Sequence, residues 1–122
     1  MITDKAKSLI ADYIVTTFTR ANVGSGGNNT SPAQLTLDVP LLANSGASYG
    51  NTAVGVKSDE NVIDFKITIL GSDASITGRT IREISINGET SDNHMFLRVP
   101  FDAIGPFSSS EEIEFFIAVE IE

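Results

Sequence analysis

The sequence predicts a mainly β fold: an antiparallel, jelly-roll-like β-sandwich of about six to eight strands with one short N-terminal α-helix. Apolar and polar residues alternate along most of the chain from Val54 onward, and helical spacing is confined to the first residues. A length of 122 residues suits a single domain. We therefore expect one domain over residues 1–122, with the helix at about 4–15 and the β-sandwich at about 17–122.

The N-terminal segment has the features of an amphipathic helix. Thr3 or Asp4 can cap it by accepting hydrogen bonds from the unpaired amides of the first turn. A β-branched cluster begins at Ile14, so we expect the helix to end between Ile14 and Thr16. The face predicted to pack on the core consists of the apolar residues at helical spacing, Ala6, Leu9, Ile10, Tyr13 and Ile14.

Two stretches poor in apolar side chains are predicted to be loops, at residues 24–32 and 43–52. Both are rich in Gly and Asn, which tolerate turn conformations. We expect the segments 22–32 and 43–52 to become ordered on assembly with a neighbour. Between them, the alternation over residues 35–39 predicts a short strand that Pro40 ends or places at an edge.

Four further strands are predicted before the last one. Residues 54–56 precede a half-buried strand at 63–69, with a turn at 58–61 between them. A strand at 76–86 leads to the turn signal Asn87-Gly88 and a polar loop that reaches His94. In the next strand the residues expected to share a core face are Met95, Leu97, Val99 and Phe101.

The C-terminal strand shows the clearest alternation in the chain. Five large apolar residues from Ile113 to Ile121 point one way, and each contributes about 1.5–3 kcal/mol when buried. We therefore expect this strand to anchor the core, and its truncation to unfold the domain. The opposite face carries Glu114, Phe116, Ala118, Glu120 and Glu122.

Charge and composition exclude several classes of function. The chain has 8 Lys plus Arg against 16 Asp plus Glu, a net charge of −8, which disfavours nucleic acid and anionic membranes. No apolar run approaches the ~20 residues of a membrane span, and charged residues interrupt any signal-peptide pattern. Without Cys, the chain has no disulfide, thiolate metal site or cysteine nucleophile.

No arrangement of residues predicts catalysis or a cofactor. His94 is the single histidine, and with Asp92 it is expected to be solvated in a loop rather than part of a catalytic triad. A metal at this pair needs further ligands, and Asp59 and Glu60 are interpreted as turn residues rather than a calcium site. We therefore predict no enzyme activity, no metal and no cofactor.

The glycine-rich loop does not match a phosphate-binding motif. It has Gly24 and Gly26 but Asn29 at the position of the third glycine of the dinucleotide fingerprint, and no helix is predicted to follow. It also lacks the Gly-Lys-Ser/Thr ending of a P-loop. A surface loop that orders against a neighbouring subunit is the preferred interpretation.

Two aromatic residues depart from the alternation and are candidate interface residues. Phe116 lies between Glu114 and Glu120 on the polar face of the last strand, and Phe96 is opposite the Met95/Leu97 face. Both aromatic rings either contact the second sheet or the helix, or anchor a contact between subunits. The candidate interface therefore consists of Phe96, Phe116, Glu114 and Glu120.

The order of motifs resembles small virion structural proteins of tailed bacteriophages. The opening Met1–Asp12 is similar to their "I-T-x-x-G-K-x-L-I" helix, with Ala in place of the glycine, and 23–32 to the Gly- and Thr/Ser/Pro-containing loop that follows. Ile81–Ile84 is similar to their "I-R-E-I" strand, Arg98–Ile104 to "R-V-x-F-D-x-I", and Ile113–Glu122 to their closing strand. The resemblance runs in order over nearly the whole chain.

The resemblance implies a β-sandwich that works through assembly. It implies a component of the tail, baseplate, fibre or neck, located in the virion as a symmetric homo-oligomer whose partners are other virion proteins and its own copies. A capsid decoration (cement) protein on the head exterior is the first alternative. A receptor- or glycan-binding module is the second, although the chain has no Trp and Tyr13 is expected inside the helix–core contact. No catalytic residues are implied.

Overall fold

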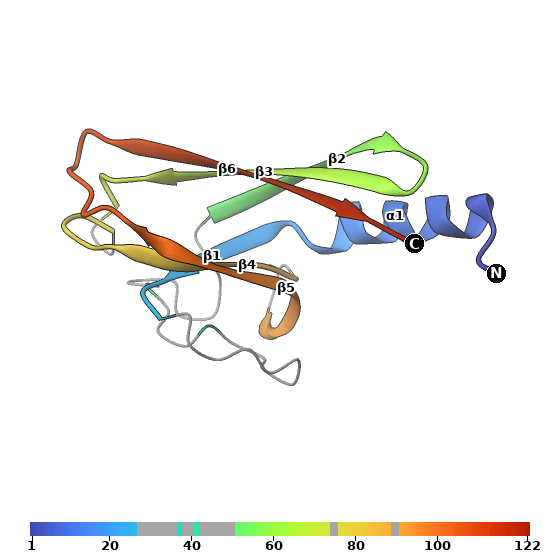
Figure 1. Ribbon diagram of the computed structural model, residues 1–122, viewed down its shortest axis with the longest axis horizontal. Coiled ribbons are helices and arrows are strands. Elements are labelled where there is room, and N and C mark those ends of the chain that lie inside the picture. The colour runs from blue at the N-terminus through green and yellow to red at the C-terminus, as the bar shows by residue number, and fades with distance from the viewer. Residues whose placement is uncertain (27–36, 38–40, 42–50, 74–75, 89–90) are drawn as a thin grey trace.

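The computed structural model describes residues 1–26, 37, 41, 51–73, 76–88 and 91–122, without the side chains of residues 51 and 91–94. One helix precedes six strands within this part of the chain (Figure 1). The elements are α1 (Asp4–Thr17), β1 (Arg20–Gly24), β2 (Asn51–Asp59), β3 (Val62–Leu70), β4 (Ile81–Gly88), β5 (Ser91–Ile104) and β6 (Glu112–Glu120).

The helix begins as predicted and ends slightly later. Thr3 is the cap, and its hydroxyl accepts a hydrogen bond from Ala6 N at 3.2 Å. At the other end, the Thr16 hydroxyl donates to Asp12 O at 3.0 Å, and Phe18 N donates to Ile14 O at 3.0 Å. These bonds satisfy carbonyls of the last turn, so the β-branched cluster stays helical as far as Thr17.

The predicted core face of α1 is confirmed for Ile14 but wrong for Leu9, Ile10 and Tyr13. Ala11 and Ile14 are buried, whereas Leu9 and Ile10 are exposed, and Tyr13 is 64% exposed. The small Ala11 lets the helix backbone approach the sheet closely, a contact that a prediction from large apolar residues overlooks. The inward side also carries polar groups, because Lys57 Nζ of β2 donates to Ser8 Oγ at 2.8 Å and pairs with Asp12 Oδ1 at 2.9 Å.

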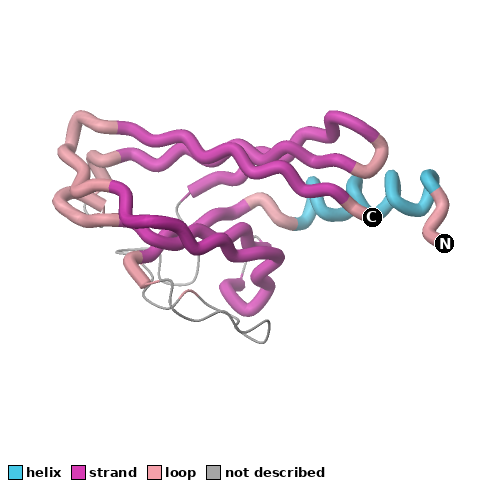
Figure 2. Tube along the Cα trace, in the orientation of Figure 1, coloured by secondary structure: helices cyan, strands magenta, loops and turns pink. Residues whose placement is uncertain are grey.

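The strands form one antiparallel sheet in the order β5-β4-β1-β2-β3-β6. The pairing of β1 with β2 is brief and covers Arg20↔Thr52 and Ala21↔Asn51. On either side of this short pairing the sheet curls, so that β2-β3-β6 and β1-β4-β5 lie in separate layers (Figure 2). The fold is therefore a mainly β, curled six-stranded sheet with one N-terminal helix.

The core fills the concave side of the curled sheet. In β3, the alternation of Ile63, Phe65, Ile67 and Ile69 is confirmed, because all four are buried. The apolar side chains of β6 point toward the same core but are only partly buried, since β6 is the outermost strand. The C-terminal strand therefore packs its apolar face on the core as predicted, but the most buried side chains lie in β3 and β4 rather than in β6.

Strand β5 departs from simple alternation because it is bulged. Its pairing with β4 shifts register between Ile86 and Asn87, where Phe96 is the extra residue between Leu97 and Met95. Phe96 and Leu97 consequently both pack on the core, whereas Val99, on the predicted core face, is exposed. A single face of alternating residues in this strand is therefore a wrong prediction.

Several predicted boundaries also change. Residues 22–24 belong to β1 and residues 51–52 to β2, so neither set is part of a loop. His94 lies within β5, which starts at Ser91, rather than in the predicted hairpin loop. The strand predicted at 76–86 starts only at Ile81, and the predicted strand at 35–39 lies outside the described residues except for the buried Leu37.

Candidate protein interface

The convex side of β2, β3 and β6 forms a continuous surface, in which the cross-strand register decides which side chains are neighbours. Val54 lies beside Lys66, and Lys66 lies beside Phe116, which makes one row across the three strands. The next row places Asp64 of β3 between Val56 and Ala118. We call this surface the β2–β3–β6 face, and it consists of Val54, Val56, Asp64, Lys66, Thr68, Leu70, Glu114, Phe116, Ala118 and Glu120.

Large apolar side chains on the β2–β3–β6 face are exposed. Phe116 is 71% exposed, Val56 60%, Val54 53% and Leu70 48%. Single exposed apolar residues are common on protein surfaces, but several on one sheet face are typical of an interaction site. An exposed aromatic ring is the kind of residue that dominates protein–protein interfaces.

The valines face outward because the inner side of β2 has no room for them. Ala53 is buried, and a Cβ atom placed on Gly55 would lie 2.9 Å from Phe65 Cε1. A small residue must therefore occupy position 55 on the inner side of β2. The branched side chains of Val54 and Val56 take the alternate positions, on the convex surface.

Charge on this face is mixed but acidic at the β6 border. Lys66 Nζ lies 3.5 Å from Glu114 Oε1, and both side chains are substantially exposed. Such an exposed ion pair contributes roughly 0–1 kcal/mol, so either residue can exchange this partner for another at little cost. Glu112, Glu114 and Glu120 are the charged residues of β6, all of one sign.

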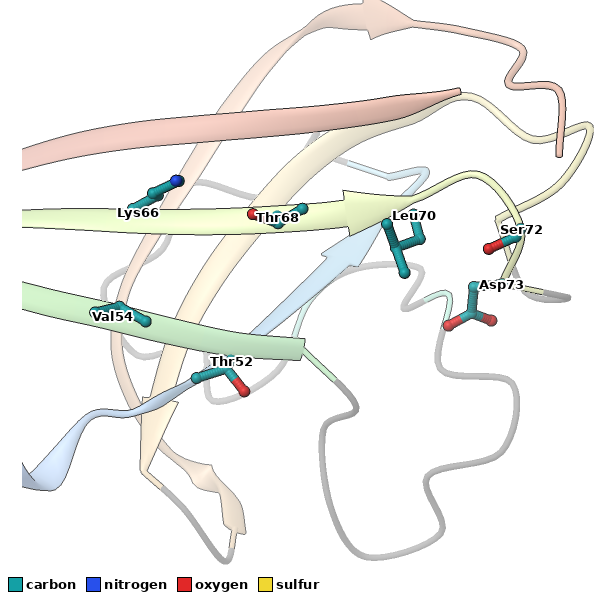
Figure 3. A pocket seen from close by; sticks show the side chains of 7 residues that line it. All are labelled: Thr52, Val54, Lys66, Thr68, Leu70, Ser72 and Asp73. Atoms are coloured by element: carbon teal, nitrogen blue, oxygen red, sulfur yellow. The ribbon is translucent and has the colours of Figure 1, made fainter. Parts of the chain in front are cut away.

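One end of the face is hollowed. A depression of about 600 Å³ lies between the ends of β2 and β3 and the turn that follows β3 (Figure 3). It combines apolar walls with Lys66 and Asp73 at opposite ends. The depression is large enough to hold a protein side chain. The residues that line it are Thr52, Val54, Lys66, Thr68, Leu70, Ser72 and Asp73.

The structure brings together three of the four predicted interface residues. Glu114, Phe116 and Glu120 are all exposed on β6. Phe96 is separate from them, because its ring stacks on Phe18 at a centroid distance of 4.8 Å and lies 6.3 Å from Phe65. Phe96 is therefore an internal packing residue, as one of the two sequence interpretations holds, and not a surface anchor.

The sequence alone does not predict Val54, Val56 and Leu70 as members of this face. The two valines are predicted only as part of a strand that pairs with residues 63–69. The signal lay in the inward positions of the same strand, where Ala53, Gly55 and Lys57 alternate with the valines. Small and charged residues at alternate positions indicate that the larger residues between them face the other way.

A second group of polar residues is buried on the convex side of β1 and β4. Glu83, Ser85, Asn87 and Asn22 are all buried, and Ser85 Oγ donates to Asn87 Oδ1 at 2.6 Å. Glu83 Oε1 lies 3.6 Å from Nε of the largely buried Arg98. Buried polar groups of this kind fix the register of neighbouring strands, so we interpret the group as structural.

The remaining candidate metal ligands form no cluster among the side chains that the structure describes. Asp59 is the last residue of β2 rather than a turn residue, and its Oδ1 accepts a hydrogen bond from Glu60 N at 2.7 Å where the turn begins. The side chains of Asp92 and His94 lie outside the described part of the structure. Within the part described, no three His, Cys, Asp or Glu side chains gather as metal ligands. The same residues include no helix that is both long and apolar enough to cross a membrane.

Comparisons with protein-family models, with curated proteins and with solved structures find no match to this chain. The exposed face and the sequence motifs are therefore the features that bear on function.

Proposed function

We propose that this protein is a structural component of a tailed-phage virion that assembles through protein–protein contacts in the tail, baseplate, fibre or neck. The observation that carries the proposal is the β2–β3–β6 face, where Phe116 and three other large apolar side chains are exposed together. Burying this face against a neighbour removes apolar area from water, which favours association. The protein acts by shape and surface complementarity and needs no catalytic group.

The ordered resemblance of the sequence to small phage virion proteins supports this choice among assembly proteins. As part of the same proposal, we regard the two layers of the curled sheet as the two halves of a jelly-roll-like β-sandwich. Symmetric copies of the chain are present in the particle, each using the face toward a neighbour. A cement protein on the capsid exterior would use the same face against the head, and is the alternative location.

A receptor- or glycan-binding module is a second candidate, because Tyr13 is exposed rather than packed inside the helix–core contact. Sugar sites stack rings on exposed aromatic side chains. A glycan array probed with the purified chain tests it. Binding that Tyr13→Ala abolishes would support this candidate, and silence across the array would reject it.

Incorporation of variants into particles tests the main proposal. Phe116→Ser removes the exposed aromatic ring of the face, and we expect a loss of at least about tenfold in the amount of chain per purified particle, measured by mass spectrometry. Leu9→Ser is the matched control, since Leu9 is an exposed apolar residue on α1. Absence of the wild-type chain from particles, or normal incorporation of Phe116→Ser, would contradict the proposal.

A further inference from the structure

Strand β6 is a regular strand with one paired side. Its nine residues pair with β3 from Val62↔Glu120 to Leu70↔Glu112 without any shift of register. Among the strands that the structure describes, β6 stands at the end of the sheet and has β3 as its one neighbour. A strand of this length and regularity offers a template for another strand.

The hydrogen bonds next to β6 establish which backbone groups face its open side. Ile121 N donates to Asn61 O at 2.8 Å, and Gly71 N donates to Glu111 O at 2.7 Å. Residues of an antiparallel strand alternate between bonding their neighbour and pointing away from it. The odd-numbered residues of β6 therefore bond to β3, and the N–H and C=O groups of Glu114, Phe116 and Ala118 point outward.

The two edge strands of the sheet differ in how well they are protected against the addition of a further strand. At the opposite end, β5 contains Pro100, which has no N–H to donate, and its pairing with β4 is interrupted by bulges. Both features are known to block the addition of a further strand. Strand β6 has neither Pro nor Gly, no bulge and no charged residue on its inward face.

The core is incompletely covered along β6. Phe115, Ile117 and Val119 pack against the core but are only partly buried, whereas Phe65 and Ile67 of the adjacent β3 are fully buried. An added strand would extend the sheet and place its own apolar side chains beside these residues. Burial of this additional apolar area and the new backbone hydrogen bonds would both favour binding of the strand.

Charge determines what kind of strand fits. All charged residues of β6 are glutamates, and the whole chain carries a net charge of −8. Antiparallel pairing of β6 with β6 of a second copy, centred on Phe116, sets glutamates directly against glutamates, which is destabilising. A strand with Lys or Arg on the outer side instead places each cation opposite or diagonal to a glutamate.

We propose that β6 accepts, by strand addition, an extended segment of another protein in which Lys or Arg alternates with apolar residues. This inference rests on the proposed function and names the partner's chemistry: the basic side chains lie beside Glu114 and Glu120, and the apolar ones cover Phe115, Ile117 and Val119.

Peptide binding to the full chain tests this inference. The probe is a fluorescent peptide of nine residues, the length of β6, in which Lys alternates with Val. We expect it to bind, to slow hydrogen exchange at the amides of Glu114, Phe116 and Ala118, and to lose affinity when its backbone is N-methylated at alternate residues. A peptide with Glu in place of Lys should bind at least about tenfold more weakly.

Two variants at one position form the matched pair. Ala118→Pro removes an outward N–H without removing a bond to β3, and should weaken binding of the Lys peptide about tenfold. Ala118→Ser keeps the N–H and should bind as the wild type does. Circular dichroism and the thermal midpoint confirm that each variant is folded. If Ala118→Pro unfolds the strand, Glu120→Lys, which leaves the backbone intact, takes its place and should weaken binding of the same peptide.

Four results would overturn the inference: no binding of the Lys peptide, equal binding of the Glu peptide, protection confined to other strands, or a concentration-dependent dimer that pairs through β6. These outcomes leave the proposed function intact if Phe116→Ser still fails to enter particles. Normal incorporation of Phe116→Ser rejects the proposed function instead, whatever the peptide does.

Discussion

Gly55 lies directly opposite Phe65 in the pairing of β2 with β3. This contact determines to which side of the sheet the large side chains of β2 point. The ring of Phe65 occupies the space above the glycine on the core side. Only a small residue fits there, so the large residues of β2 are directed to the convex surface. A local packing requirement in the core thus produces the exposed apolar face.

Gly55→Ala should lower the free energy of unfolding by about 1–3 kcal/mol, because the new methyl group meets the buried Phe65 ring. Urea denaturation followed by circular dichroism measures the change. In the double variant with Phe65→Leu, the Gly55→Ala substitution should cost less than it does alone, since the ring atoms at 2.9 and 3.2 Å are gone. Equal costs in both backgrounds would show that the contact is not the cause.

Phe96 and Phe116 should respond oppositely to truncation. Phe96→Ala removes a ring stacked between Phe18 and the core and should destabilise the protein by about 2–4 kcal/mol. Phe116→Ala, at an exposed position, should change stability by no more than about 0.5 kcal/mol. Thermal or urea unfolding of both variants checks this, and a large loss for Phe116→Ala would contradict its placement on the surface.

At the scale of elements, the sequence predicts a strand more accurately when neighbouring strands pair with it regularly and the core covers one of its faces. Strand β3 is paired on both sides and packs one face on the core, so its alternation of apolar and polar residues predicts it accurately. Strand β5 carries bulges that shift side chains between faces, and no local pattern marks them. The cap residue and the spacing of apolar residues predict where helix α1 lies in the sequence. Its buried side depends instead on how Phe18 and β1 continue the chain into the sheet.

The helix orientation gives a prediction of its own. Ile14→Ala should destabilise the protein by about 2–4 kcal/mol, because Ile14 is buried against the sheet. Ile10→Ala makes the same chemical change on the outward side and should cost no more than about 0.5 kcal/mol, since Ala also favours the helix. Unfolding midpoints in urea compare the two, and equal losses would mean that α1 packs by a different face.

At the scale of the whole molecule, the sequence predicts the β class, the N-terminal helix and three of the candidate interface residues. It does not predict the order β5-β4-β1-β2-β3-β6, because pairings such as β1 with β4 join segments far apart in the chain. That order decides that β6 is an outermost strand and that Val54 and Val56 share a surface with Phe116. The candidate interface therefore emerges only when the sheet is assembled.

The curl of the sheet brings its two ends toward each other, and the rings of Phe101 in β5 and Phe115 in β6 lie 5.5 Å apart. The concave side is thereby occupied by the core, whereas the convex β2–β3–β6 face stays exposed. We propose that the two sides of β2, β3 and β6 have separate roles: the inner side stabilises the fold, and the outer side joins the chain to a particle.

Site-specific photo-crosslinking tests this claim most directly. A benzophenone-bearing phenylalanine analogue replaces Phe116, the particles are purified and irradiated, and covalent partners are identified by mass spectrometry. We expect crosslinks from position 116 to another virion protein or a second copy, and far fewer from the same analogue at Leu9. Absence of the chain from particles, or crosslinks from position 9 but none from position 116, would contradict the claim.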